Sequence, residues 1–272
     1  IERIVPSLGK PLRVQFYVLK ENLEGAEKLL DQVEIFVEFF TRNFGQFPWI
    51  EEKLGLVNTP YFGMEHQTMI AYGNDYKKSE KGYDFLLFHE MAHEWWGNYL
   101  SVSDWSDFWI HEGFAVYCEA LYIEEKYGYE EYNSFFTKNI SKKIPLSKPI
   151  VLERNSTMSQ IFGLDPYYKG AFVLHMLWYL VGDEKFFKIL KELLHSKKDL
   201  PNNQITTSDF IDIVHSVIET NIDWFFKVYL YENQYPIINQ KISHGSNHTF
   251  VELHWENSDF SMPVEVFYKS NI

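Results

Sequence analysis

The segment His89-Glu90-Met91-Ala92-His93, followed by Glu112 after 18 further residues, constrains the fold of this 272-residue chain more than any other feature. On a helix, residues 89 and 93 lie one turn apart on the same face, so both imidazoles can bind one metal ion. Glu90 points in another direction and is free to act on water, and Glu112 can supply a third ligand. Two imidazoles and one carboxylate leave the fourth position of a tetrahedral zinc site open, as in catalytic zinc sites.

Residues 83–98 are predicted to form the helix that carries the two histidines. They contain no proline, and Leu87 and Met91 are spaced i and i+4, as on the buried face of a helix. Gly97 follows His93 by about one turn, where a small residue would let another segment approach. The alternative is an amphipathic helix with two incidental histidines, and the glutamate that follows them disfavours it.

A second helix is expected to hold the third ligand. Residues 103–107 combine capping side chains with acidic residues, as is typical of a helix start, and residues 108–127 continue the helix with Glu112 near its beginning. Glu119 lies two turns further along the same face. It could hydrogen-bond the far nitrogen of a ligating histidine, and a solvated glutamate is an equally open alternative.

Four motifs follow one another along the middle of the chain: Phe62-Gly63-Met64-Glu65-His66, His89-Glu-Met-Ala-His-Glu-Trp-Trp-Gly-Asn98, Trp109-Ile-His-Glu-Gly-Phe-Ala115 and Tyr167-Tyr168-Lys169-Gly170. They resemble the motifs of the aminopeptidase N family of zinc metallopeptidases, the gluzincin aminopeptidases that are relatives of the leukotriene hydrolases. That family shows a G-x-M-E-N exopeptidase motif, then the zinc motif, then Y-x-K-G. The resemblance is strong over residues 60–175 and loose at both ends.

The chain departs from the family pattern at three positions. His111 stands before Glu112 where asparagine is usual, and Phe62 and His66 stand in the exopeptidase motif where glycine and asparagine are usual. The motif glutamate, Glu65, is retained. The exopeptidase interpretation therefore holds, while the residue that would be removed is left open.

Metal binding and catalysis are assigned to five residues. One zinc ion per chain would be bound by His89, His93 and Glu112, with Glu90 as the general base that takes a proton from water and passes it to the leaving nitrogen. The resemblance implies that Tyr167 donates a hydrogen bond to the oxyanion of the tetrahedral intermediate.

Substrate binding is assigned to the exopeptidase motif, again on the strength of the resemblance. Glu65 would bind the free α-ammonium of a peptide by a charge-assisted hydrogen bond, and the backbone of Gly63 and Met64 would lie against the substrate. Lys169 is interpreted as a structural residue that orients the start of its helix.

Composition limits the other possibilities. A net charge of −13 argues against nucleic acid as a partner, because phosphates require a basic surface. No apolar run approaches the roughly 20 residues that a membrane-spanning helix needs. The single cysteine excludes an internal disulfide. The compartment, cytoplasmic or exported, and the oligomeric state are left open.

The predicted fold class is α+β, mainly helical with a smaller β part. A thermolysin-like catalytic domain is expected over residues 1–235, strand-rich to about residue 75 and helical thereafter, followed by the beginning of a β-rich domain over 236–272. Strands are predicted at 12–19, 54–58, 63–72, 237–242, 249–255 and 264–268. Helices are predicted at 23–44, 83–98, 108–127, 129–142, 167 onward, 184–196, 208–219 and 222–232.

The leading function is removal of N-terminal residues from peptides by a zinc-dependent aminopeptidase. The alternatives are a zinc endopeptidase, an epoxide hydrolase similar to the leukotriene hydrolases, and a non-catalytic binding scaffold. The resemblance also implies that the chain is a fragment without the family's N-terminal β-rich domain. Glu65 would then bind the substrate amine in a more solvated site, and hydrolysis would be less efficient than in a longer protein.

Overall fold

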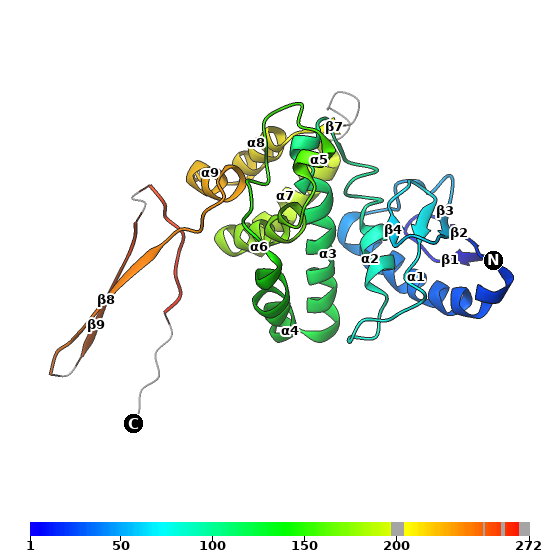
Figure 1. The fold of residues 1–272 in the computed structure, drawn as a ribbon, viewed down its shortest axis with the longest axis horizontal. Helices are drawn as coiled ribbons and strands as arrows, with labels where there is room; N and C mark the ends of the chain where they lie inside the picture. The colour runs from blue at the N-terminus through cyan, green and yellow to red at the C-terminus, as the bar shows by residue number, and fades with distance from the viewer. Residues whose placement is uncertain (197–203, 247, 257–258, 267–272) are drawn as a thin grey trace.

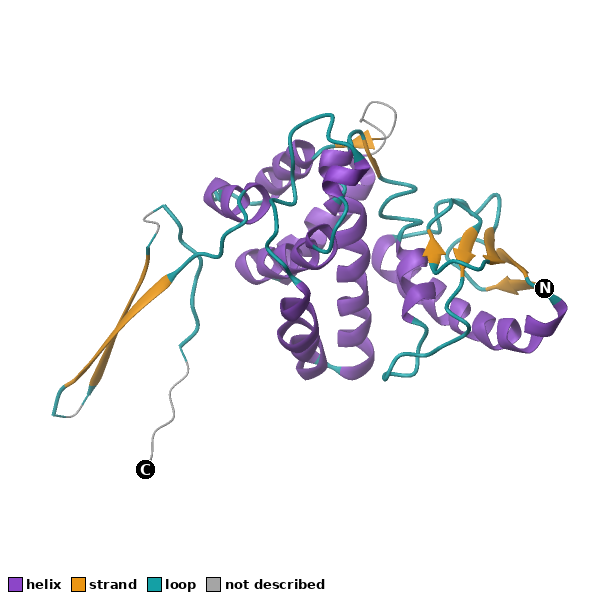
Figure 2. Cartoon of the chain, viewed as in Figure 1, coloured by secondary structure: helices purple, strands orange, loops and turns teal. Residues whose placement is uncertain are grey.

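A sheet with one long helix and a bundle of helices lie on either side of a short central helix in the computed structural model (Figures 1 and 2), which describes residues 1–196, 204–246, 248–256 and 259–266. A two-stranded hairpin extends from the far side of the helical bundle. The predicted α+β class with a helical majority is confirmed. The division into domains at residue 235 stays a prediction.

The first lobe is a mixed five-stranded sheet of order β1-β2-β3-β5-β4. The β2–β3 and β3–β5 pairs are parallel, and both edge pairs are antiparallel. Its first strand was not predicted, because four residues with two charges give no clear alternation. The strands are β1 (Glu2–Val5), β2 (Leu12–Tyr17), β3 (Leu54–Asn58), β4 (Gly63–Met64) and β5 (Ile70–Tyr72).

One long helix, α1 (Leu23–Phe44), has the predicted bounds and packs in this lobe. Its buried residues recur every three or four positions, as the helical period requires, and end in a group of phenylalanines. Phe36 and Phe40 contact Phe88 on the central helix, with ring centroids 5.0 and 4.8 Å apart. Aromatic packing therefore fixes the central helix against this lobe.

The helical lobe is built around α3 (Trp109–Tyr127), which is buried along most of its length. The neighbouring helices present apolar stripes to it and cover it. The helices of this lobe other than α3 are α4 (Tyr129–Ser134), α5 (Met158–Ile161), α6 (Gly170–Val181), α7 (Asp183–Ser196), α8 (Thr207–Val217) and α9 (Asp223–Tyr231), of which α4 and α6 make the most contacts with α3. The remaining strands are β6 (Ser101–Val102), paired with β7 (Gln204–Ile205), and the hairpin of β8 (Ile238–His244) and β9 (Thr249–Trp255).

Several predicted boundaries were wrong. The central helix, α2 (Phe85–Ala92), ends before the predicted residue 98. Trp95 and Trp96 are buried where the chain leaves the helix, and Gly97 then turns it with a φ of +140°, which is unfavourable for other residues. Residues 129–143 are helical, close to the predicted 129–142, but the α-helix changes into a π-helix after Ser134 and into a 3-10 turn after Ile140. Helix α8 begins at Thr207, one residue before the predicted start, and Thr206 caps it. Residues 264–266 form no strand, and 267–268 lie outside the described residues.

Two glycines let α3 and α6 touch through their backbones. A Cβ atom on Gly113 would lie 2.9 Å from the Cα of Gly170, and a Cβ on Gly170 would lie 3.0 Å from the Cα of Gly113. Gly113 follows Glu112 directly, and Gly170 ends the Tyr167 motif. The contact between the two glycines therefore fixes the distance between Glu112 and Tyr167.

Gly170→Ala is expected to lower the free energy of unfolding by about 1–3 kcal/mol, because backbone atoms cannot yield to the added methyl group. The measurement is urea unfolding of the variant beside the wild type. An ordinary helical glycine gains about 0.5–1 kcal/mol of stability on replacement by alanine. An unchanged or increased stability would therefore show that the two helices are not in backbone contact.

Candidate metal centre and catalytic cleft

The start of α2 is fixed by a buried carboxylate, Asp84. Its side chain accepts hydrogen bonds from the backbone N–H of Leu87 at 3.0 Å, from the Tyr72 hydroxyl at 2.5 Å and from the Asn74 amide at 3.1 Å. Burial raises the pKa of Asp84, while these donors oppose the rise. Because Tyr72 and Asn74 belong to the end of the sheet, the network ties the helix that carries both histidines to the first lobe.

The start of α3 is fixed in a similar way from the other lobe. Asp104 caps a short 3-10 turn, Trp105–Asp107, through the N–H of Ser106 at 2.9 Å. Asp107 accepts a hydrogen bond from the N–H of Thr207 at 3.0 Å. Glu112 then falls in the first turn of α3, where the helix dipole favours a carboxylate.

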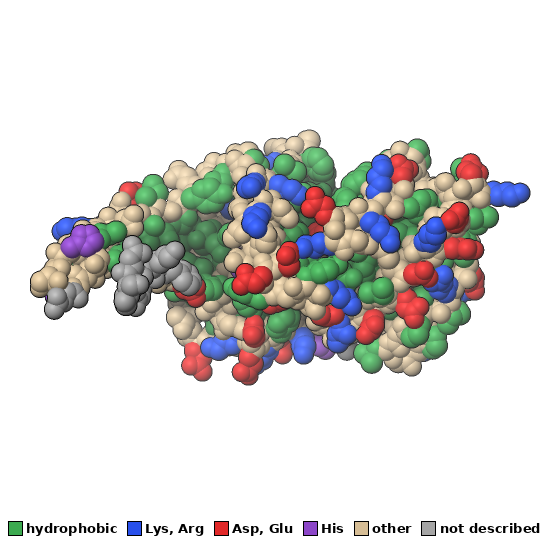
Figure 3. Space-filling view, turned by 90° about the horizontal axis from the view of Figure 1, so that it is seen from below, with side chains coloured by type: hydrophobic (Ala, Val, Ile, Leu, Met, Phe, Trp, Pro, Cys, Tyr) green, Lys and Arg blue, Asp and Glu red, His purple; other side chains and the backbone are tan. Residues whose placement is uncertain are grey.

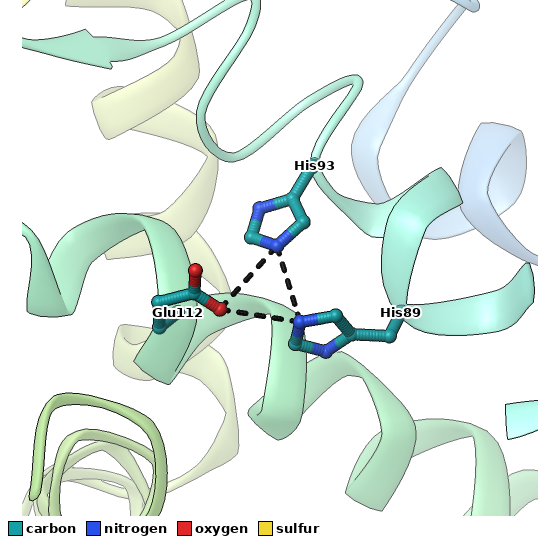
Figure 4. A group of neighbouring side chains, drawn as sticks. All are labelled: His89, His93 and Glu112. Atoms are coloured by element: carbon teal, nitrogen blue, oxygen red, sulfur yellow. Dashed lines mark hydrogen bonds and ion pairs between the residues drawn. The ribbon is translucent and has the colours of Figure 1, made fainter. Parts of the chain in front are cut away.

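The side chains of His89, His93 and Glu112 converge between the two helices (Figure 4). The Nε2 atoms of the histidines are 3.2 Å apart, and the Oε2 atom of Glu112 lies 3.2 Å from one and 3.4 Å from the other. Ligands bound to tetrahedral zinc at 2.0–2.1 Å are separated by about 3.4 Å. The three donor atoms therefore fit zinc in both kind and spacing.

The hydrogen bond from His93 to Trp96 and the charge of Glu112 both favour a cation between the three side chains. His93 Nδ1 lies 3.0 Å from the carbonyl oxygen of Trp96, which makes Nδ1 the donor and leaves the Nε2 lone pair facing the other ligands. Burial lowers the pKa of His93, but Glu112 raises it by more, to about 10. The pKa of Glu112 falls below its usual range, because both histidines outweigh its burial. Both shifts show that the charges of the site favour a cation.

Glu90 is buried beside the three donors. Among the described residues, its Oε2 atom has no hydrogen-bond partner, which is unusual for a buried carboxylate. Burial raises the pKa of Glu90 to about 7, and the two histidines oppose the rise. A Cβ atom on Gly63 would lie 2.5 Å from the Oε1 atom of Glu90. The carboxylate is therefore held under β4 with one oxygen left for water.

Glu65, which follows β4 in the sheet lobe, lies beside Glu90 and His93. One carboxylate oxygen of Glu65, one of Glu90 and a nitrogen of His93 all lie within 4.8 Å of one another. The carbonyl of Glu65 accepts a hydrogen bond at 2.8 Å from Asn98, whose amide also reaches Glu94 at 3.3 Å.

The sequence analysis missed these two supporting residues. Glu94 is fully buried and accepts a hydrogen bond from the N–H of Thr68 at 2.9 Å, so it holds the loop that follows Glu65. Asn98 stood at the end of the quoted zinc motif, but sequence spacing could not show that it reaches back to residue 65. The sequence signal that could have indicated them was the presence of these two polar residues on either side of Trp95 and Trp96.

Tyr167 comes from a π-helical turn, Asp165–Lys169, that leads into α6. Its ring is nearly parallel to that of His89, with centroids 6.2 Å apart and an angle of 15°. Burial, together with the nearby Glu112 carboxylate, raises the pKa of Tyr167, so the phenol stays protonated. Lys169 donates to the carbonyl of Glu232 at 2.6 Å, which holds this turn against the end of α9.

Glu119 has a different partner from the expected histidine. In the described part of the chain, its Oε1 atom accepts a hydrogen bond from the hydroxyl of Tyr83 at 2.5 Å. Tyr83 precedes α2, so this bond links the two zinc-motif helices instead of orienting a ligand. His111 also has a structural contact, because its Nε2 atom accepts from the N–H of Val102 at 3.2 Å and burial lowers its pKa to about 4.

All of the predicted site residues except Lys169 line one cleft of about 650 Å³. Aromatic side chains make up much of its wall, namely Phe62, Phe85, Trp105, Phe108, Phe135, Phe162, Tyr167 and Tyr168. On the outer face shown in Figure 3, acidic and basic side chains are interspersed. None of the described helices is both long enough and apolar enough to cross a bilayer.

Comparison with known proteins identifies relatives of this chain. The family model described as the peptidase family M1 domain matches residues 30–229. Endoplasmic reticulum aminopeptidase 2 of Homo sapiens is 29% identical over 209 residues, which cover 68% of this chain and 21% of the relative. The chain thus spans about a fifth of the length of that protein.

Two solved structures share the fold. An M1 zinc metallopeptidase mutant from Deinococcus radiodurans, bound to a Tyr-Ser-Ala substrate, has a TM-score of 0.68 and 20% identity, covering 87% of this chain and 53% of that chain. Legionella pneumophila aminopeptidase A, in complex with aspartic acid, has a TM-score of 0.74 and 15% identity, covering 94% of this chain and 31% of that chain.

Proposed function

The chain belongs to peptidase family M1, and from this premise we propose that it is a zinc-dependent aminopeptidase domain that removes N-terminal residues from peptides. The observation that carries the proposal is the position of Glu65, which lies within 4.8 Å of the catalytic candidates Glu90 and His93. A carboxylate so close to the reacting bond leaves space for about one residue of an extended peptide before it.

One zinc ion per chain would be held by His89, His93 and Glu112. When bound, zinc lowers the pKa of water to about 7 and polarises a carbonyl group. The donor spacing of 3.2–3.4 Å and the preference of the group for positive charge support this assignment. The matched protein from Deinococcus radiodurans is a zinc metallopeptidase as well.

Glu90 would act as the general base. Its unpartnered Oε2 atom accepts the proton of the attacking water and delivers it to the leaving nitrogen. A carboxyl group with a pKa near 7 suits both steps, because it gains and loses a proton readily at neutral pH. Tyr167 would donate its hydroxyl proton to the developing oxyanion, as its position over His89 allows.

Glu65 would bind the free α-ammonium of the substrate. The negative charge of Glu65 favours an ammonium group, and the hydrogen bond from Asn98 fixes its backbone. A zinc endopeptidase would gain nothing from a carboxylate in this position. None of the contacts described here favours an epoxide over a peptide, and a non-catalytic scaffold would have no need for a complete donor set.

The activity is tested with a panel of aminoacyl reporter substrates and their N-acetylated counterparts, each with and without a zinc chelator. We expect turnover of free-amine substrates only, and its loss in chelator with recovery when zinc is added back. Equal hydrolysis of blocked and free substrates would instead indicate an endopeptidase.

Glu65→Gln serves as the matched variant, because it keeps the shape of the side chain and removes its charge. The expected effect is a lower kcat/KM for free-amine substrates with an unchanged zinc content. An unaltered preference for free over blocked substrates would assign amine recognition to another group.

A further inference from the structure

We propose that Phe62 and Phe85 form the pocket for the side chain of the second substrate residue, and that they select peptides with an apolar residue in that position. The inference rests on the proposed aminopeptidase function and extends it to the substrate class. It concerns a residue, Phe62, that sets this chain apart from the motif it resembles.

Three contacts show that the 62–65 segment runs in the same direction as α2 along the cleft. The ring of Phe62 contacts that of Phe85 at the start of the helix, with centroids 5.9 Å apart. Gly63 lies against Glu90, one turn further along. The carbonyl of Glu65 is bonded to Asn98, beyond the C-terminal end of the helix.

This order fixes the direction in which a peptide lies. The amine is bound at Glu65, and the first peptide bond must lie beside Glu90, next to Gly63. An extended peptide advances about 3.3 Å per residue, so the second residue continues past Gly63 and away from Glu65. Phe62, which precedes β4, and Phe85, the first residue of α2, lie in that direction and line the cleft.

The pair is exposed and apolar. Phe62 is 56% exposed and Phe85 is 38% exposed, although both line the cleft. Leu86, which packs against Gly63, continues the same apolar wall. The carboxylates of the cleft lie away from this pair: Glu65 follows β4, Glu90 lies further along α2, and Glu112 and Glu119 lie on α3. Two adjacent exposed rings in a binding cleft favour an apolar ligand, because its side chain would remove their surface from water.

The backbone beneath Phe62 is held in place without help from its side chain. The carbonyl of Phe62 accepts a hydrogen bond from the N–H of Gly73 at 2.8 Å, and β4 pairs with β5 directly after it. Removal of the ring should therefore change the pocket while the strand keeps its position. Tyr61 provides a matched control, because it is the preceding residue, is 50% exposed and does not line the cleft.

The test uses tripeptides that share their first and third residues and carry leucine, phenylalanine, glycine or aspartate in second position. The wild-type protein, with zinc, is expected to cleave the leucine and phenylalanine peptides with about 10-fold higher kcat/KM than the glycine peptide. Phe62→Ala and Phe85→Ala should each reduce this ratio several-fold. Tyr61→Ala should retain the wild-type ratio.

Binding of the same peptides to the Glu90→Gln variant, measured by calorimetry, gives a second readout that needs no turnover. The order of Kd values should follow the order of kcat/KM, and the additional change Phe62→Ala should flatten it. Cleavage or binding that does not depend on the second residue would overturn this inference alone. If no peptide is bound or cleaved, the proposed function fails with it.

Discussion

Replacement of Glu90 by glutamine is expected to lower kcat by about 10²–10⁴-fold while the zinc content stays at one equivalent per chain. The amide has nearly the same shape as the carboxylate but cannot accept the proton of the attacking water. Glu90 is not one of the three donors that converge at 3.2–3.4 Å, so its charge is not needed to hold the metal. The measurements are steady-state kinetics and metal analysis of the same preparation.

His93→Ala is the paired variant and should give the opposite metal result. It removes a fully buried ligand whose Nδ1 is bonded to the Trp96 carbonyl, so both zinc and activity should be lost. The comparison separates loss of the base from loss of the metal. Full zinc retention in His93→Ala would refute the ligand assignment, and near wild-type turnover in Glu90→Gln would refute the assignment of the base.

The parts of the fold that could be predicted are those governed by local periodicity. The bounds of α1 were predicted because its buried residues repeat at helical spacing up to Gly45. The ligand set was predicted because residues one turn apart on a helix must share a face. The family resemblance then supplied the order of the remaining motifs.

The contacts that could not be predicted are those between segments distant in sequence. The end of α2 depends on tertiary packing of Trp95 and Trp96, which are fully buried and turn the chain where local propensity favours helix. The bond from Asn98 to Glu65 spans 33 residues, and no spacing rule connects them. Glu119 was placed on the face of α3 that carries Glu112, with either a ligating histidine or solvent as its partner, and the Tyr83 hydroxyl reaches it instead.

The position of Tyr167 has the same dependence on distant contacts. It lies on a π-helical turn that is held by the Lys169 bond to Glu232 and by the close approach of Gly170 to Gly113. These contacts direct the phenol over His89 without any local sequence signal. The residue is thus positioned by the helical lobe, whereas Glu65 is positioned by the sheet lobe, and the cleft requires both.

Tyr167→Phe should lower kcat by about 10²–10³-fold with little change in KM, because a donor to the oxyanion is used in the transition state and not in the ground state. The ring is retained, so its packing against His89 and Phe108, at 6.2 Å from each, should be preserved. Zinc content and the urea midpoint are therefore expected to match the wild type.

Kinetics of Tyr167→Phe beside Tyr129→Phe provide the check, because Tyr129 is exposed on α4 and does not line the cleft. Tyr129→Phe should keep the wild-type rate. If Tyr167→Phe raised KM and left kcat intact, the hydroxyl would be a substrate-binding group. Stabilisation of the oxyanion would then fall to the metal alone, and the helical lobe would contribute Glu112 but no direct catalytic donor to the reaction.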